Sequence, residues 1–297
     1  LKIRQNNSTL KLNFFFIIFQ FIVPQHLLSR IAGKLAASKN IKLKNTLISY
    51  FLNNYEINMN EALNENALEY ESFNDFFTRD LKQDARPISQ GGNVIISPAD
   101  GVVSQFGSIK SGEIFQAKGR AFTLLDFLGG NEKISNEFVD GSFATIYLSP
   151  KDYHRVHMPF SGTLKSMDYI PGDLFSVNPV TVDSVDNLFS RNERLSCLFD
   201  TDNGPMAVVL VGAMIVAGIR VTWKITPFRK NRKIQHFTYP KEGEGSVQLN
   251  KGEELGRFLL GSTVIICFPH NKIKWNSNIQ ANSILKMGEA ISHTIIK

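Results

Sequence analysis

Short apolar runs, separated by turn-forming residues, fill the chain from about residue 94 to its end. Each run is rich in β-branched or aromatic side chains, and Gly, Pro, Asn or Asp stands between one run and the next. The clearest runs are residues 94–96, 101–103, 143–148, 163–169, 206–219 and 262–268. Because short runs between frequent turns are typical of antiparallel sheets, this part of the chain is predicted to be a mainly antiparallel β domain.

The first 55 residues have a different character. They contain eight Lys and Arg residues and no Asp or Glu, and the first acidic residue is Glu56. Residues 12–23 are apolar apart from Asn13 and Gln20, include the sequence FFFIIF, and end at Pro24. Nucleic acid could pair with the charge, but it gives no reason for the phenylalanines. An anionic membrane surface explains both features.

This apolar run is too short to cross a bilayer as a helix, which needs about 20 residues. Residues 27–35 and 43–51 show the spacing of amphipathic helices, so we expect two or three short basic helices lying on a membrane. A helical cap on the protein's own core is an alternative, and the two can coexist. A secretory signal peptide is a further alternative, with small residues at 32–37 as its cleavage region. The organised pattern that continues downstream argues against it.

The predicted fold class is α+β, with short N-terminal amphipathic helices followed by a mainly antiparallel β domain that carries the active site. Residues 1–55 are the expected membrane-associating helices, residues 56–93 a helical connector, and residues 94–297 the β-rich catalytic domain. Within the connector, Ser72 and Asp75 form a capping-box pattern that opens a short helix.

Other common site types find little support in the sequence. Cys197 and Cys267 lie far apart and in no metal-ligand spacing, so neither a zinc site nor a disulfide framework is predicted. A reducing compartment fits them better than an oxidising one. Gly243 and Gly245 are followed at the third fingerprint position by Gln248, so no dinucleotide-binding motif is predicted.

Gly261-Ser262-Thr263 stands directly before the run 264–268, which has the character of a buried strand and ends at Pro269. A plain loop-to-strand junction would use the glycine for an unusual φ and the hydroxyls to satisfy backbone groups. Alternatively, Ser262 is a nucleophile, and Gly261, which has no Cβ, leaves its own carbonyl open to attack. Both interpretations stay open on these residues alone.

The stretch SPKDYHRVHMP contains two of the six histidines. Ser149 and Pro150 suit the start of a helix, and Pro159 disfavours helix just before it, so at most two turns are expected. On such a helix His154 and His157, three residues apart, would share a face.

Three interpretations of His154 and His157 remain. A metal pair lacks a third ligand at a supporting spacing. Two core or surface histidines with ordinary hydrogen bonds are the plain alternative. In the catalytic interpretation, one is a general base and the other serves a different proton transfer, because an imidazole with a pKa of about 6.5 is mostly neutral at pH 7.

Asp100 lies in the turn sequence SPADG, where its ordinary role is to cap its own backbone. Together with His157 and Ser262 it also supplies the carboxylate, the base and the hydroxyl of a nucleophile relay. The trio alone is weak evidence, because any chain of this length holds such residues. A membrane-bound serine hydrolase that does not cut itself would use the same trio, and a non-enzymatic membrane-binding β domain would not need it.

Longer stretches add a resemblance to the family of bacterial, membrane-associated phosphatidylserine decarboxylases. The longest is residues 251–265, KGEELGRFLLGSTVI. The others, in family order along the chain, are FNDFF (73–77), PADGV (98–102), YHRVHMP (153–159), PGDLFSVN (171–178) and NLFSRNER (187–194). This combined signature is highly specific. Phe160 departs from it at a position where a small residue is expected, and the N-terminal helices match more in character than in sequence.

The resemblance implies a proenzyme that cuts itself. Asp100 would orient His157, and His157 would deprotonate Ser262. The serine oxygen would then attack the Gly261 carbonyl and convert the peptide bond to an ester. Elimination would leave a dehydroalanine, whose hydrolysis gives a pyruvoyl group at residue 262 with loss of ammonia.

The resemblance also implies the products and the reaction. A large chain, 1–261, and a small chain, 262–297, would stay associated as a heterodimer, with further dimerisation left open. The mature enzyme would decarboxylate phosphatidylserine to phosphatidylethanolamine through a Schiff base on the pyruvoyl group, without a metal. His154 is the expected proton donor to the α-carbon. A two-chain lipid stays in its bilayer, so we expect a peripheral enzyme on the cytoplasmic face of the cell membrane, bound to anionic lipid and not to nucleic acid.

Overall fold

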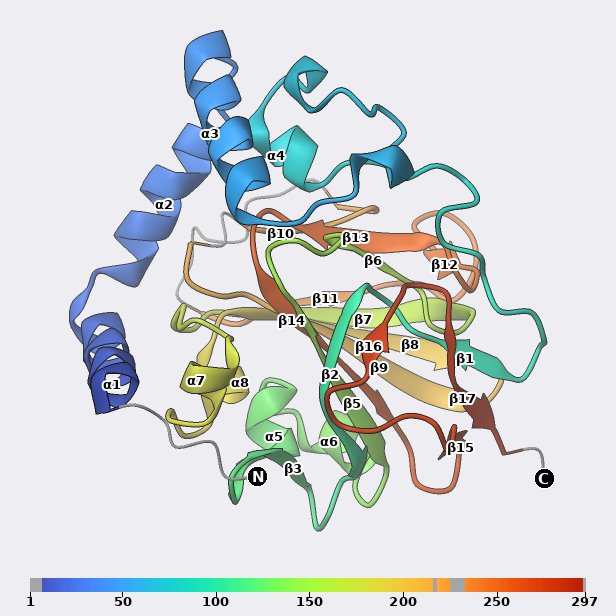
Figure 1. Ribbon diagram of the computed structural model, residues 1–297. Coiled ribbons are helices and arrows are strands. Elements are labelled where there is room, and N and C mark those ends of the chain that lie inside the picture. The colour runs from blue at the N-terminus through green and yellow to red at the C-terminus, as the bar shows by residue number, and fades with distance from the viewer. Residues whose placement is uncertain (1–6, 216–217, 225–232, 296–297) are drawn as a thin grey trace.

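The structure is a computed structural model, and it describes residues 7–215, 218–224 and 233–295. Residues 1–6 of the predicted membrane-associating segment and residues 216–217 of the predicted run 206–219 lie outside these ranges. Within the described ranges, helices come first and a mainly antiparallel β body follows (Figure 1), so the predicted α+β fold class is confirmed.

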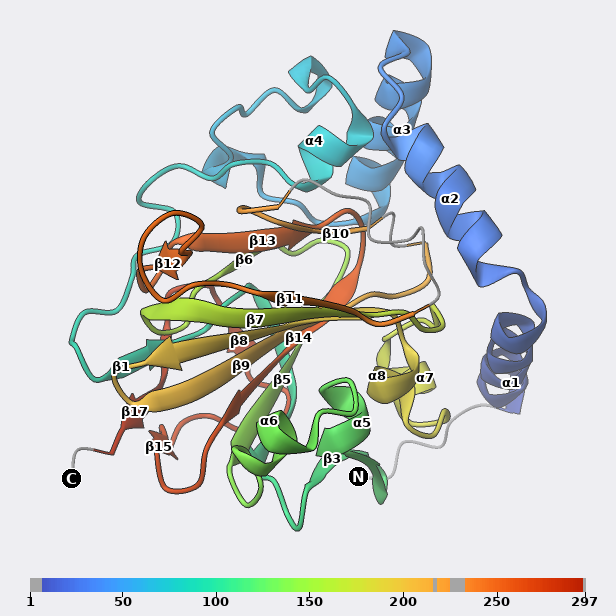
Figure 2. The same ribbon diagram turned by 180° about the vertical axis from the view of Figure 1, so that it is seen from behind.

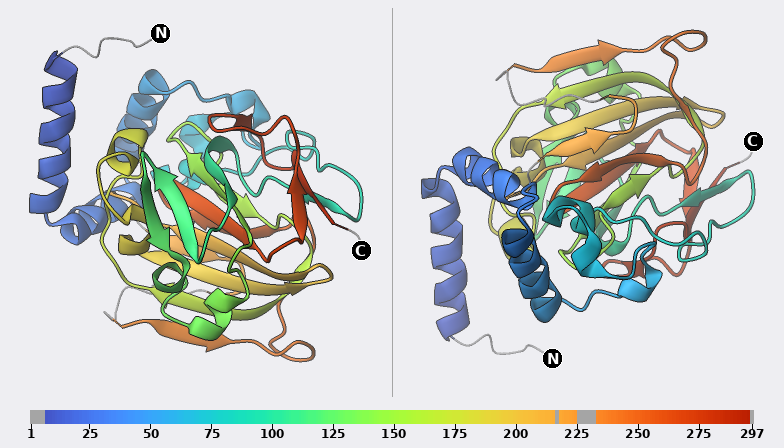
Figure 3. Two further views of the ribbon diagram at one scale, coloured as in Figure 1. Left: turned by 90° about the horizontal axis from the view of Figure 1, so that it is seen from below. Right: turned by 90° about the horizontal axis from the view of Figure 1, so that it is seen from above.

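Three helices form an arm beside the β body: α1 (Asn7–Ile22), α2 (Gln25–Ala36) and α3 (Ile41–Asn54). Figure 3 shows α1 at the margin of the molecule, with the strands to one side of it. No helix among the described residues is by itself long and apolar enough to cross a membrane. Residues 12–22 and α2 reach that length and composition only as a pair, and they are bent by 92° at the break.

The outer helix α1 is fastened to the β body by one face. Gln20 is fully buried, and its amide nitrogen donates to the Thr181 hydroxyl over 3.2 Å. The backbone amide of Ser176 donates to the Gln20 side-chain oxygen over 2.7 Å. The rings of Phe21 and Phe175 meet edge to face at 4.8 Å. Because a buried amide satisfied on both sides is costly to remove, α1 is part of the folded protein.

The connector continues through η1 (Met59–Glu61), η2 (Ala67–Glu69) and α4 (Phe73–Phe77), above the sheet in Figure 1. The predicted capping box is confirmed, since the Ser72 hydroxyl accepts from the Asp75 amide over 3.2 Å and donates to its carboxylate over 2.7 Å. The phenylalanines of α4 then pack against Ile48 of α3, so the helical cap on the protein's own core is present.

The large sheet is antiparallel throughout, with strands in the order β11-β7-β8-β9-β14-β5-β2-β16 and with β12 also paired to β7. Its strands are β2 (Gly101–Ser108), β5 (Ser142–Leu148), β7 (Gly162–Ile170), β8 (Arg194–Thr201), β9 (Gly204–Val211), β11 (Gln235–Thr238), β12 (Gln248–Leu249), β14 (Ser262–Phe268) and β16 (Ile284–Leu285).

Strand β14 lies inside this sheet and is buried on both faces. Val264 and Ile266 pack into the apolar cluster on one face, and Ile265 and Cys267 pack into the cluster on the other. The strand is paired along its length, with Ser262 opposite Leu148 of β5. The buried strand predicted from the run 264–268 is therefore confirmed.

Smaller elements complete the body. One small sheet consists of β10 (Ile219–Val221), β13 (Glu254–Phe258) and β6 (Arg155–His157). A second consists of β1 (Val94–Ile96), β17 (Ala290–Thr294) and β15 (Ile273–Trp275). A hairpin is formed by β3 (Glu113–Ala117) and β4 (Arg120–Thr123). The short helices α5 (Leu124–Phe127), α6 (Glu132–Asn136), α7 (Pro179–Val182) and α8 (Leu188–Arg191) gather on the side of the large sheet away from α4 (Figure 2).

The helix predicted around His154 and His157 is wrong. Residues 155–157 form strand β6, which pairs with β13, and His157 lies opposite Glu254. In an extended segment, side chains three residues apart point to opposite faces, so the two histidines do not share one. Pairing with a segment about 100 residues away has overridden the local helix signals.

Candidate active site

Ser262 begins β14, at the point where the chain enters the buried sheet. Its side chain is fully buried, and its hydroxyl oxygen has no hydrogen-bond partner among the described residues. Buried hydroxyls are usually hydrogen-bonded, and the neighbouring Thr263 hydroxyl is a second exception, so the position of Ser262 after Gly261 and Leu260 distinguishes it.

Leu260, two residues earlier, has a backbone φ of 113°, a conformation that residues other than glycine rarely adopt. Such a residue costs about 1–3 kcal/mol and persists only where its surroundings hold it. Here the leucine side chain packs against the aromatic cluster of Phe73, Phe76 and Phe77. The helical connector thus holds a strained residue directly before Gly261-Ser262.

His154 lies beside this segment. The backbone amide of Phe258 donates to the His154 carbonyl over 3.0 Å, and only residues 259–261 separate Phe258 from Ser262. The imidazole is fully buried, with Nδ1 2.8 Å from the Asp152 carbonyl and its ring 4.1 Å from that of Phe77. Nε2 has no partner among the described residues. Burial lowers the pKa of His154 to about 3, so the ring is neutral.

His157 is held in a single tautomer. Its Nδ1 lies 2.8 Å from the Gly252 carbonyl, which can only accept, so Nδ1 carries the proton. Nε2 then accepts from the Tyr153 hydroxyl over 3.2 Å. Burial lowers the pKa of His157 and raises that of Tyr153, which keeps the base neutral and the phenol protonated. The pair is suited to accept a proton at Nε2.

Asp100 is buried and fully engaged by other groups. Arg86 donates to both carboxylate oxygens, over 2.8 Å to Oδ1 and 3.1 Å to Oδ2 from Nε. The Met287 amide donates to Oδ1 over 2.8 Å, and Lys286 Nζ lies 3.4 Å from Oδ2. Asp100 and His157 share no hydrogen bond within the described residues. They are joined only through the backbone, where the His157 amide donates to the carbonyl two residues before Asp100 over 2.7 Å.

The structure therefore brings the predicted residues to one region without assembling the complete relay. His154 is hydrogen-bonded to Phe258, four residues before Ser262, and His157 is linked to the turn of Asp100 through a backbone contact. Sequence reasoning missed the partners that hold them, above all Arg86 and Tyr153. Tyr153 stands within the histidine stretch and could have been noticed there. Arg86, in contrast, precedes a proline in the connector and has no distinguishing spacing.

Comparison with known proteins agrees with the resemblance. The sequence model of the phosphatidylserine decarboxylase family matches residues 73–293, and a second model, described as PSD, matches residues 15–56. A phosphatidylserine decarboxylase proenzyme of Pseudomonas putida (strain W619) is 52% identical over 279 residues, which cover 93% of this chain and 96% of that protein.

Two further relatives carry the same name. The proenzyme of Saccharophagus degradans (strain 2-40) is also 52% identical over 279 residues, with 93% and 96% of the two chains covered. That of Vibrio cholerae (strain O395) is 50% identical over 276 residues, with 92% and 96% covered. The similarity spans the N-terminal helices as well as the β body. This chain is therefore an enzyme of the phosphatidylserine decarboxylase family.

Proposed function

We propose that this enzyme converts phosphatidylserine to phosphatidylethanolamine and CO₂, using a pyruvoyl group that it makes from Ser262 by cutting its own chain. The observation that carries the proposal is the buried, unpartnered Ser262 hydroxyl directly after Gly261 and the strained Leu260. The relatives named above as proenzymes support the self-cleavage. In the cut, the Ser262 oxygen attacks the Gly261 carbonyl, and elimination from the resulting ester releases the large chain with a free carboxyl terminus.

A neutral base must take the Ser262 proton. His157 is proposed for this step, because its tautomer leaves Nε2 unprotonated and its burial keeps the ring neutral. Asp100 carries the negative charge that stabilises the imidazolium as it forms. Its ties to Arg86 and to the chain after Ser262 keep that charge in a fixed place.

The two products should remain together after the cut. β14 stays hydrogen-bonded between β5 and β9 whether or not the bond before Ser262 exists. Asp100 on the large chain also binds Lys286 and Met287 on the small chain. These contacts support the proposed heterodimer of residues 1–261 and 262–297.

The pyruvoyl group, once formed, would hold the amine of the substrate and accept the electrons released with CO₂. The chain's own task is then to protonate the former α-carbon. His154 is proposed as the donor, because its buried Nε2 has no partner among the described residues and its carbonyl is bonded to Phe258, four residues before Ser262. A substrate carboxylate next to this buried ring would raise its pKa and so load it with the proton that it delivers.

Denaturing mass spectrometry tests the proposal. We expect two chains, with the small one beginning at residue 262 and lacking the amine of Ser262. An intact chain with an unmodified serine would instead indicate a membrane-bound serine hydrolase that does not cut itself.

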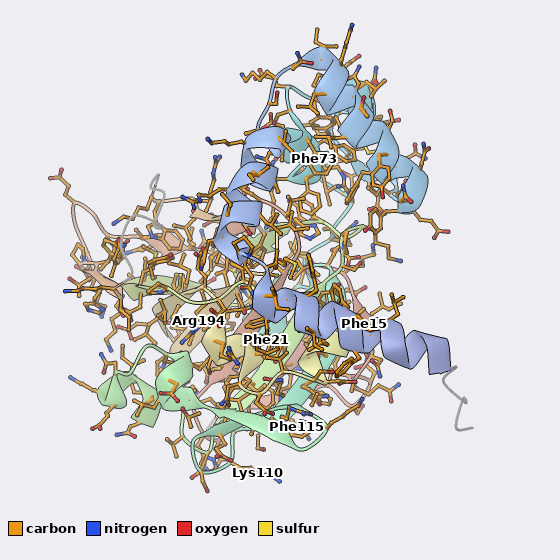
Figure 4. The ribbon with its side chains drawn as sticks, turned by 90° about the vertical axis from the view of Figure 1, so that its left-hand side faces the viewer. Phe15, Phe21, Phe73, Lys110, Phe115 and Arg194 are labelled. Carbon is orange, nitrogen blue, oxygen red and sulfur yellow. The ribbon has the colours of Figure 1, made fainter. Side chains whose placement is uncertain are left out.

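We further propose that α1 to α3 hold the enzyme on the cytoplasmic face of the anionic cell membrane. On α1, Phe14 and Phe15 are 63% and 65% exposed, while Gln20 fastens the opposite face to the β body. Figure 4 shows α1 crossing this side of the molecule, with Phe15 and Phe21 on it. Deleting residues 1–23 should weaken binding to anionic vesicles, and unchanged binding would place the anchor in residues 27–51.

A further inference from the structure

Arg79 follows α4 and is a buried cation with no hydrogen-bond acceptor in the described ranges. Its side chain is 5% exposed, and its Nε has no hydrogen-bond partner among the described residues. The nearest aromatic contact is the Phe76 ring, whose centroid lies 5.9 Å from the guanidinium carbon. That contact offers no acceptor in the plane of the guanidinium, where its donors point.

Other buried arginines of the described chain are all satisfied. Arg86 binds two carboxylates, Arg155 binds a carbonyl and two carboxylates, and Arg194 binds four carbonyls. Leaving a buried charge unpaired costs several kcal/mol. Arg79 therefore carries a desolvated guanidinium charge that a bound anion would stabilise.

Arg79 lines a small polar cavity of about 140 Å³. Most carboxylates around this cavity already have partners, since Glu61 and Asp100 bind Arg86, and Asp152 accepts from the amide and hydroxyl of Ser149. Glu56 and Lys151 also line the cavity and offset each other in charge. Four acidic and four basic side chains line the cavity, so Arg79 differs from them in lacking a hydrogen-bond acceptor among the described residues and not in an excess of charge.

The cavity adjoins the proposed catalytic groups. Asp100 and Tyr153 line it, and Tyr153 is hydrogen-bonded to His157. Two residues before Arg79, Phe77 packs on the His154 ring. An anion on Arg79 would thus share a cavity with Asp100 and Tyr153, next to the proposed catalytic groups.

We propose that Arg79 binds the phosphodiester of the lipid headgroup and forms a phosphate subsite beside the catalytic centre. The identity of this ligand rests on the proposed function. The headgroup carries two anions, and the reaction distinguishes them. Decarboxylation removes the charge of the carboxylate, so an arginine bound there would stabilise the substrate over the transition state and slow the reaction. The phosphodiester keeps its charge throughout and is joined to the α-carbon through only one oxygen and one methylene. Its two free oxygens match the guanidinium fork.

Titration calorimetry on the full-length, uncut Ser262→Ala protein tests the subsite with two soluble probes. Glycerophosphoethanolamine has the phosphodiester without the carboxylate, and L-serine has the carboxylate without the phosphate. Adding Arg79→Met should weaken glycerophosphoethanolamine binding about tenfold to a hundredfold, the range for hydrogen bonds to a charged group, and leave L-serine binding unchanged. Arg120→Met, which removes an arginine outside the cavity, is the matched control and should change neither.

Two results would overturn the proposal. One is a loss of L-serine binding with glycerophosphoethanolamine binding kept, which would make Arg79 a carboxylate subsite. The other is equal affinities with and without Arg79. If Arg79→Met does not fold, Arg79→Lys is the variant to test. Lysine keeps the charge but lacks the guanidinium fork, so its affinity for glycerophosphoethanolamine should still fall. An unchanged affinity would contradict the subsite. The mass of the wild-type small chain reports separately on the pyruvoyl proposal, so the two can fail independently.

Discussion

The two halves of the site are built in opposite ways. Around Asp100, each carboxylate oxygen accepts hydrogen bonds, from Arg86 and from the Met287 amide. In the other half, the Ser262 hydroxyl and His154 Nε2 are just as deeply buried and have no partner within the described part of the chain.

This difference separates support from reaction. A satisfied buried charge fixes geometry, and removing one partner is strongly destabilising. An unpartnered hydroxyl loses no hydrogen bond when it reacts. The strained Leu260 near it also raises the free energy of the intact chain, and a break in the chain can release that strain. We therefore expect substitutions in the Ser262 half to act on chemistry, and substitutions in the Asp100 half to act on stability as well.

The largest expected effect is that of Ser262→Ala. Without the hydroxyl there is no attack on Gly261, so cutting should be abolished and the protein should run as a single inactive chain. Because the lost oxygen makes no hydrogen bond, we expect the thermal stability of this variant to be no lower than that of the wild type. The intact mass and the unfolding temperature together check both statements.

Thr263→Val is the matched control for that variant. The Thr263 hydroxyl, one residue further along the same strand, is also buried and has no partner in the described part of the structure. The isosteric change should leave cutting and decarboxylation intact. A block of cutting by Thr263→Val would show that the junction as a whole, and not the Ser262 oxygen, is required.

The two histidines should separate the two reactions. His157→Ala should prevent cutting, because it removes the proposed base. His154→Ala should still cut, but it should decarboxylate poorly, because the proposed proton donor is gone. The small-chain mass measures the first step, and CO₂ release per pyruvoyl group measures the second. Full turnover in cleaved His154→Ala would remove its assignment as proton donor.

The extent to which the sequence predicted this arrangement depended on the range of the interactions. Ser72 and Asp75, three residues apart, were predicted to cap α4 and do so. The buried strand before Pro269 was likewise evident from its own residues. In contrast, β6 forms where a helix was predicted, because it pairs with β13. That partner lies about 100 residues away, so the local sequence does not indicate the pairing.

Contacts of the site show the same limit. Asp100 was singled out in a turn, but its partners Arg86 and Met287 lie 14 and 187 residues away. No local pattern marks such pairs, and they depend on how the connector and the C-terminal strands meet. The unpartnered state of Ser262 is equally a property of the packed structure.

Arg86→Met sharpens the comparison from the Asp100 half. It leaves a buried carboxylate without its main counter-charge, so we expect a loss of about 3–5 kcal/mol in the free energy of unfolding. Urea unfolding of the purified variant measures this loss. Lys82→Met breaks an exposed ion pair with Glu65 and should cost less than about 1 kcal/mol. Equal losses in the two variants would contradict the distinction.

The last prediction concerns the pH dependence of stability. Burial lowers the pKa of His154 from 6.5 to about 3, so between these values the unfolded chain binds a proton that the folded chain does not. Stability must then fall as the pH drops from 6.5 towards 3. His154→Gln should reduce the slope of unfolding free energy against pH in this window by about one proton. Equal slopes for His154→Gln and wild type would mean that the His154 ring already takes up its proton in the folded protein. The unpartnered Nε2 would then no longer distinguish the Ser262 half of the site from the Asp100 half.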